Sequence, residues 1–183
     1  MTDWKVRKAN IDDTDKVVEL SQDYEEFLMP YTFNPFVVRK YIDQFVVAEE
    51  RLEPTEGIVG VGVGGTLHVI PSDESREGEG SFEKLSNFLL YVKQVPPDVI
   101  VDFLRTKNIA FIGQVICPGK GSFYSILEEM KKEYEEIWCW MSVVGPSYKS
   151  YKRYGFEFGE ERTFWNIYKR DYSTFTLGKW RKE

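Results

Sequence analysis

The sequence predicts a mixed α/β fold in a single domain, and three observations support this prediction. Its 183 residues suffice for one domain with a sizeable core. The stretch 108–140 reads as a strand, a glycine loop, a helix and a second strand. Before it, apolar segments at 45–49 and 58–69 flank a turn at 53–57, which is typical of a hairpin. We therefore expect helices packed on a central sheet.

Composition limits the classes of partner. The net charge is −6 and the pI about 5.1, which argues against non-specific nucleic-acid binding and is compatible with a cationic acceptor. The first residues lack an apolar signal region, and no apolar run approaches membrane-spanning length. The two cysteines, Cys117 and Cys139, form neither a metal-binding spacing nor a disulfide framework. We expect a cytoplasmic protein with free thiols and no metal.

The first third of the chain predicts a strand, two helices and the hairpin. Residues 4–9 alternate as a strand, and a helix runs from about 12 to 28, followed by a short helix at 36–44. Glycines crowd the second hairpin strand, where they permit a bulge or a close contact. His68, the only histidine, is taken as filler rather than a catalytic base. The acidic segment 72–80 reads as a surface loop.

A helical insertion is expected at about 81–106. Apolar residues at 82–92 fit one helical face, Pro96-Pro97 ends it, and 98–104 predicts a second short helix. The segment carries more apolar side chains than a helix needs to cover a sheet. The surplus is expected to face the substrate cleft or a second subunit, so a homodimer is one arrangement that it allows.

The loop 118–121, Pro-Gly-Lys-Gly, separates the strand 109–116 from a helix with apolar residues at helical spacing. Two glycines allow close approach of a ligand to the backbone, and the following helix favours an anion at its N-terminus. The loop therefore predicts a site for a phosphate-bearing ligand, with a plain turn as the alternative. It is not an NTPase loop, since Gly121 follows Lys120 where Ser or Thr is required. It is not a dinucleotide fingerprint either, because Tyr124 occupies the place of the third glycine.

The C-terminal part predicts a short helix at 147–154 and strands at 156–158 and 163–168, joined through 159–162. The basic tail, 179–183, is expected to be frayed.

Residues 145–156, GPSYKSYKRYGF, together with 108–140, resemble the GCN5-related N-acetyltransferase (GNAT) superfamily. In that family a strand ends in a pyrophosphate-binding loop Q/R-x-x-G-x-G/A, and a later short helix ends Y-x-K-x-G-F. The run YKRYGF fits the second pattern with Arg153 in place of lysine, and Gly121 fits the first glycine of the loop. The chain departs from the pattern at Pro118, in place of Gln or Arg, and at Phe123, in place of Gly or Ala. An Asn common in the family is replaced by Val144 or a neighbour.

This resemblance implies a GNAT-like α/β fold: a central, mostly antiparallel sheet of six to seven strands, splayed after the fourth and flanked by helices. It implies acetyl-CoA as co-substrate and no metal. The backbone of the fourth strand pairs with the pantetheine arm, and the loop and helix start hold the pyrophosphate. The cofactor-binding residues so implied are Gln114, Val115, Ile116, Gly119, Lys120, Gly121, Ser122 and Phe123.

Acyl transfer to an amine requires deprotonation of the amine, polarisation of the carbonyl and protonation of the departing thiolate. By resemblance Tyr151 is the acid, although an aromatic core residue on an amphipathic helix is the alternative interpretation. Tyr148 and Tyr154 are weaker candidates because they fall elsewhere on the helix. The strand 109–116 carries no carboxylate, so the base is unassigned.

Glu49 and Glu50 are the nearest candidates for that base, since they end the first hairpin strand. Cys117 adjoins the loop, but no histidine lies near it in sequence, so a buried thiol is preferred over a nucleophile. In GNAT proteins the first helix pair flanks the acceptor cleft, so Tyr31 and Phe33 are the substrate-binding candidates; packing beneath a loop is the alternative.

The sequence is thus interpreted as an acyl-CoA-dependent N-acyltransferase that acetylates a small-molecule or protein amine by direct transfer. One alternative is a catalytically inactive GNAT-like binding or assembly module, because Pro118 and Phe123 alter the phosphate loop. Another is a transferase with an unusual acceptor such as a nucleobase, which the acidic charge disfavours.

Overall fold

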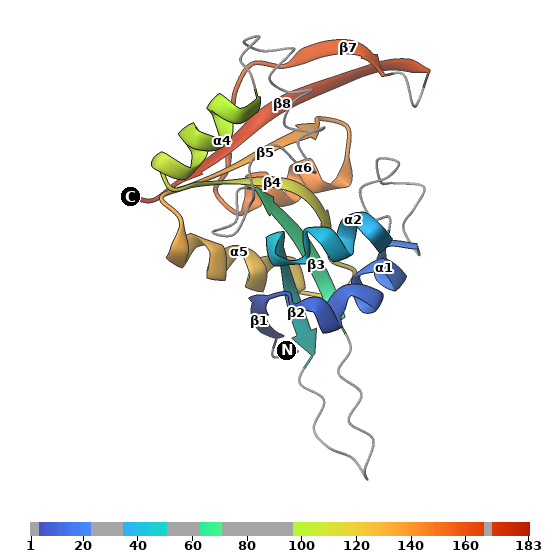
Figure 1. The fold of residues 1–183 in the computed structure, drawn as a ribbon. Helices are drawn as coiled ribbons and strands as arrows, with labels where there is room; N and C mark the ends of the chain where they lie inside the picture. The colour runs from blue at the N-terminus through green and yellow to red at the C-terminus, as the bar shows by residue number, and fades with distance from the viewer. Residues whose placement is uncertain (1–3, 23–34, 51–62, 71–96, 167–169) are drawn as a thin grey trace.

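The computed structural model describes five segments of the chain, and Figure 1 shows their arrangement. These segments are residues 4–22, 35–50, 63–70, 97–166 and 170–183. Several predictions lie wholly or partly outside them. They are the end of the first helix, the hairpin turn with the start of its second strand, the acidic loop, the first helix of the insertion, the end of the strand at 163–168, and the residues Tyr31 and Phe33.

The described residues form one sheet of eight strands, against the six to seven that we predicted. Its order is β1-β2-β3-β4-β5-β8-β6, and β7 pairs with β8. β4 and β5 pair in parallel, and the other described pairs are antiparallel, so the prediction of a mostly antiparallel sheet is confirmed. The strands are β1 (Trp4–Lys8), β2 (Phe45–Glu50), β3 (Val63–Ile70), β4 (Ile109–Ile116), β5 (Glu136–Ser142), β6 (Glu157–Phe158), β7 (Arg162–Asn166) and β8 (Asp171–Arg181).

The helices fall close to their predicted positions. A capping box closes the start of the first one, where the Asn10 side chain accepts from the amide of Asp12 and the Asp13 carboxylate accepts from the amide of Asn10. The short helix predicted at 98–104 is present as α4. The helices are η1 (Ile11–Asp13), α1 (Thr14–Gln22), α2 (Pro35–Lys40), η3 (Ile42–Gln44), α4 (Pro97–Thr106), α5 (Ser122–Glu133) and α6 (Pro146–Arg153).

Helices cover both faces of the sheet (Figure 1). Val47 and Ala48 are neighbours in β2, both fully buried, and a strand directs successive side chains to opposite faces. Val47 packs in the cluster formed by α1 and α2, whereas Ala48 packs in the cluster of α5 and α6. α4 lies on the α1 side, because Phe103 contacts Trp138, which alternates with Ile137 of the α5 cluster.

β4 and β5 separate along their length. They pair from Ile109↔Glu136 to Ile112↔Cys139, but each strand continues beyond that point. The register of β4 against β3 shifts between Ile112 and Gln114, which marks a β-bulge at the same place. The part of β4 after the bulge therefore pairs with β3 on one side and has no β5 partner on the other, as the predicted splay after the fourth strand requires.

The prediction of a frayed basic tail at 179–183 is wrong, because residues up to Arg181 belong to the strand β8. This strand is the one that the sequence analysis did not predict. It runs beside β5 from Ser142↔Phe175 to Glu136↔Arg181. Its buried face consists of Thr176 and Gly178, which carry little apolar surface and so gave no hydrophobic signal. Gly178 is required there, since a Cβ would lie 2.8 Å from the Cys139 sulfur.

The expected bulge and close contact among the β3 glycines are both confirmed. The register of β2 against β3 shifts between Ala48 and Glu49, opposite Gly65 and Val63. A Cβ on Gly65 would lie 2.8 Å from both the Cys117 sulfur and the Ser122 hydroxyl. β3 therefore passes directly beneath the loop that follows β4.

Candidate functional site

The loop between β4 and α5 closes on itself through Ser122. The Ser122 amide and hydroxyl both donate to the Gly119 carbonyl, at 3.0 and 2.7 Å. The Ser122 side chain is fully buried, so its hydroxyl serves the loop rather than a ligand. Gly121, the residue before α5, has φ +88°, a conformation that glycine adopts without steric cost.

The start of α5 presents unpaired backbone donors. Within the described residues the amides of Gly121, Phe123 and Tyr124 have no acceptor, whereas that of Ser125 donates to the Gly121 carbonyl. Free amides and the helix dipole together favour an anion. The exposed loop residue Lys120 adds a positive charge. The start of α5 thus has the unpaired donors that the predicted anion site requires, within the described residues.

Trp4 of β1 holds this loop in place, a contact that the sequence did not reveal. Its indole Nε1 donates to the Lys120 carbonyl at 3.1 Å. The bond occupies the Lys120 carbonyl oxygen, which lies one residue before Gly121 at the start of α5. No local motif signals it, because 116 positions separate the two residues.

Phe123, the departure from the family's small residue, is accommodated by packing inward. Its ring lies 4.9 Å from that of Tyr151 and 5.6 Å from that of Tyr154, both near edge-on. The side chain thereby joins α5 to α6, and the backbone amide of Phe123 has no acceptor in the part of the chain that the structure describes. A large residue here is compatible with an anion at the loop.

Tyr151 lies in the core and is 1% exposed. Its ring packs edge-on against Phe156 as well as Phe123, with centroids 4.9 Å apart in each case. Burial, with smaller contributions from Cys139 and Cys117, raises the pKa of Tyr151 well above its ordinary value. The hydroxyl makes no hydrogen bond to the described residues and stays protonated at neutral pH. Because the side chain is buried, the hydroxyl can donate its proton only to a group that enters the core beside it.

The predicted cofactor segment Gln114–Ile116 occupies the part of β4 beyond the bulge. Its backbone pairs with β3 through His68↔Gln114, Leu67↔Val115 and Thr66↔Ile116. Because β5 has diverged there, the segment borders the splay, and the loop lies directly beyond its end. The structure therefore brings together β4, the loop, the start of α5 and Tyr151.

Glu49, a candidate base, is already engaged. Arg7 of β1 donates to Glu49 and also forms a bidentate pair with Asp13 at 2.7 and 2.8 Å. The hydrogen bond from Arg7 holds the pKa of Glu49 below its ordinary value of 4.5. Burial alone would raise the pKa of Asp13, but hydrogen bonds from Arg7 and the Asn10 amide hold it below 3.8. An ion-paired carboxylate of lowered pKa is a poor proton acceptor.

We expect Arg7→Met to lower the free energy of unfolding by about 2 kcal/mol at neutral pH, because it removes the cationic partner of the buried Asp13 carboxylate and leaves it only the Asn10 amide. Both carboxyl pKa values are depressed in the folded protein. Their contribution is therefore complete above about pH 5 and is lost as pH falls through the folded values. Urea unfolding at neutral and strongly acidic pH measures this.

Lys5→Met is the control, since it removes an exposed cation from the same strand. It should cost about 0.5 kcal/mol or less. If Arg7→Met lowered the free energy of unfolding as much at strongly acidic pH as at neutral pH, the proposed role of the carboxylates would be contradicted.

The other candidates are not brought to this site. Tyr31 and Phe33 lie outside the described residues, as do the side chains of Glu50 and His68. Cys139 is buried and Cys117 is half-buried, and neither forms a disulfide, in line with the prediction. No helix of the described residues is long and apolar enough to cross a membrane.

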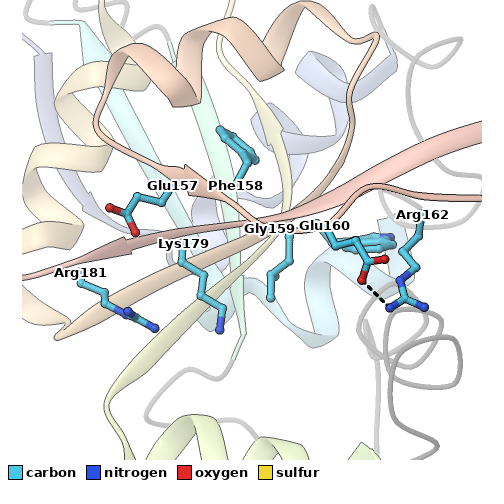
Figure 2. Close-up of a pocket in the computed structure, with 9 residues that line it drawn as sticks. Glu157, Phe158, Gly159, Glu160, Arg162, Lys179 and Arg181 are labelled. Atoms are coloured by element: carbon cyan, nitrogen blue, oxygen red, sulfur yellow. Dashed lines mark hydrogen bonds and ion pairs between the residues drawn. The ribbon is translucent and has the colours of Figure 1, made fainter.

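A separate cavity of about 360 Å³ lies over β6 and β8 (Figure 2). Its cationic side chains are already engaged: Arg162 with Glu160 at 2.7 Å, Arg181 with Glu136 at 3.4 Å, and Lys179 over the Trp138 ring at 4.0 Å. None of the predicted site residues lines it. We therefore place the candidate site at the β4–α5 loop and not in this cavity.

The arrangement of these helices and strands is similar to the fold of solved N-acetyltransferase structures. No protein-family model matches the sequence, and no curated protein sequence matches it. Solved structures match over nearly the whole chain. The Salmonella typhimurium protein yncA, solved with its cofactor acetyl-CoA, has a TM-score of 0.61 at 11% identity, over 98% of this chain and 94% of its own.

Two further structures are similar. A ribosomal-protein-alanine N-acetyltransferase from Brucella melitensis has a TM-score of 0.59 at 10% identity, covering 97% of this chain and 99% of its own. Arabidopsis thaliana NAA60, solved with a bisubstrate analogue, has a TM-score of 0.61 at 13% identity, covering 99% and 100%. The resemblance to the GNAT superfamily is thus confirmed at the level of the fold, in a divergent sequence.

Proposed function

We propose that this protein is an acyl-CoA-dependent N-acyltransferase that moves an acetyl group from acetyl-CoA to an amine by direct attack. One observation carries the proposal: at the start of α5, amides that have no acceptor among the described residues follow a strand that has separated from its neighbour β5. The amides suit a pyrophosphate, and the free edge of β4 suits the amide groups of a pantetheine arm. Solved structures of this fold with acetyl-CoA or CoA support the same ligand.

In the proposed reaction the amine nitrogen attacks the thioester carbon and forms a tetrahedral intermediate. The C–S bond then breaks, and the thiolate takes the proton of the Tyr151 hydroxyl. The amine loses a proton to a base, and Tyr151 regains one from solvent, so the products are an amide and the CoA thiol. Gln114, Val115 and Ile116 orient the arm through their backbone, while Gly119, Lys120, Gly121, Ser122 and Phe123 form the phosphate loop.

The acceptor is an amine on a small molecule or a protein. The acidic charge of the chain suits a cationic acceptor. Tyr31 and Phe33 remain the proposed acceptor-binding residues, and the cytoplasm remains the proposed compartment. Glu49 is not proposed as the base, because Arg7 holds it.

We expect saturating acetyl-CoA to raise the melting temperature by roughly 5–10 °C. A ligand at a hundredfold its dissociation constant stabilises the folded state by about 2.7 kcal/mol, and each kcal/mol is worth about 2–4 °C at this chain length. Thermal unfolding with and without acetyl-CoA measures the shift. Sodium sulfate at the same ionic strength is the control for non-specific anion binding. An unchanged melting temperature with acetyl-CoA would exclude the proposed co-substrate.

A non-catalytic CoA-binding or assembly module is the second candidate. Two observations favour it: Tyr151 is covered by Phe123, and the carboxylate of Glu49 is ion-paired. Release of CoA thiol from acetyl-CoA in the presence of an amine panel separates the two. Binding without release across peptide, polyamine and small-amine acceptors would favour the module.

A further inference from the structure

The first turn of α5 carries an exposed aromatic side chain beside the unpaired amides. Tyr124 is the third residue of α5, and its large aromatic side chain is 46% exposed. Its own backbone amide is one of the three without an acceptor in the described residues. A phosphate held by these amides would therefore lie at the same end of α5 as the exposed Tyr124 ring.

Tyr154, which follows α6, fixes the Tyr124 ring on one side. The two ring centroids are 5.4 Å apart with an interplanar angle of 41°, so the rings touch without stacking face to face. Tyr154 is held in turn by Phe123, at 5.6 Å, and by a 3.4 Å hydrogen bond from Lys131 Nζ to its carbonyl. A ring whose position is already restricted loses less conformational entropy when a ligand packs on it.

The neighbourhood combines three features that a nucleotide requires. The amides suit phosphate groups, the side chain of Lys120 supplies positive charge, and Tyr124 offers a flat apolar surface. Aromatic side chains bind bases of any sequence by stacking, since every base has a π-face. In CoA a single ribose links the adenine to the pyrophosphate, so adenine must lie close to the loop.

We propose that Tyr124, backed by Tyr154, is the platform on which the adenine of the acyl-CoA co-substrate stacks. The inference rests on the proposed function and adds the residue that reads the nucleotide half of the ligand. It predicts that the protein binds CoA more tightly than it binds ligands that have the same phosphopantetheine arm but lack the adenine base. Tyr124 would thus be a specificity-determining residue distant from the acyl group.

The chain offers a matched control. Tyr172 on β8 is 69% exposed and contacts Trp165 of β7, with ring centroids 5.3 Å apart. This pair is an exposed aromatic pair like that of Tyr124, but it lies on the β7–β8 ribbon, on strands rather than at a helix start. Tyr172→Ala therefore tests whether the loss of any exposed aromatic ring changes the affinity for CoA.

The test measures by calorimetry the affinities for CoA and for 4′-phosphopantetheine. Tyr124→Ala should weaken CoA about tenfold and leave 4′-phosphopantetheine unchanged, because stacking of one base on an aromatic ring is lost. Tyr124→Phe should bind CoA as the wild type does, since stacking needs the ring and not the hydroxyl. Tyr172→Ala should change neither affinity.

Each other outcome is decisive. If Tyr124→Ala binds CoA as tightly as the wild type, the platform is wrong while the proposed function stands. If Tyr124→Ala lowered the affinities for CoA and for 4′-phosphopantetheine equally, the effect would lie in the phosphate-binding loop, and the inference would also be overturned. If the wild type binds neither ligand, the proposed function fails and the inference with it.

Discussion

Gly121→Glu is expected to lower the affinity for CoA by a hundredfold or more while the protein still folds. The substitution puts a carboxylate beside the amides that would hold the pyrophosphate, where like charges repel. It also forces a side chain into the +88° φ of Gly121, at a cost of about 1–2 kcal/mol. The added Cβ would come no closer than 3.8 Å to Trp4 Nε1, so no overlap prevents folding. Calorimetric titration with CoA and thermal unfolding measure the two effects separately.

Gly155→Glu is a close control for this variant. Gly155 follows α6, is exposed, and has φ +87°, and its added Cβ would meet Trp180 at 3.7 Å. It should therefore lose similar stability without losing affinity for CoA. If Gly121→Glu bound CoA like the wild type, the loop would be a plain turn. If both variants lost affinity equally, backbone strain and not the cradle would be responsible.

Tyr151→Phe is expected to lower turnover roughly a hundredfold and to leave acetyl-CoA affinity unchanged. The change removes only the proposed acid, and general acid catalysis contributes about that factor. Stability should be kept, because the hydroxyl makes no hydrogen bond to the described residues and the ring keeps its contacts with Phe123 and Phe156. Steady-state kinetics with a responsive amine and urea unfolding provide the two readouts.

Tyr148→Phe serves as the control on the same helix. Its ring packs on Phe158 at 4.5 Å, and loss of its hydroxyl should leave turnover within about threefold of the wild type. Because the pKa of Tyr151 is raised above its ordinary value of 10.0, wild-type turnover should show no loss from Tyr151 ionisation below that pH. Wild-type turnover in Tyr151→Phe would make Tyr151 a core aromatic only.

The central unit followed from local signals. The strand 109–116, the loop and the helix after Gly121 are marked by an apolar run, two glycines and helical spacing, and each lies where it was expected. β8 was missed because its buried positions are Thr176 and Gly178. Glu49 was considered a base because it ends the first hairpin strand. Its pairing with Arg7 was not foreseen, since the two residues are 42 positions apart.

The sequence alone thus determined the order of elements, the glycine-bearing loop and the helix that favours an anion, because each depends on neighbouring residues and their backbone preferences. Tertiary structure decided what those residues can do. It placed Phe123 inward against Tyr151, fixed Lys120 through Trp4, and paired Tyr124 with Tyr154. These contacts connect segments far apart in the chain, and their geometry depends on packing that no local pattern encodes.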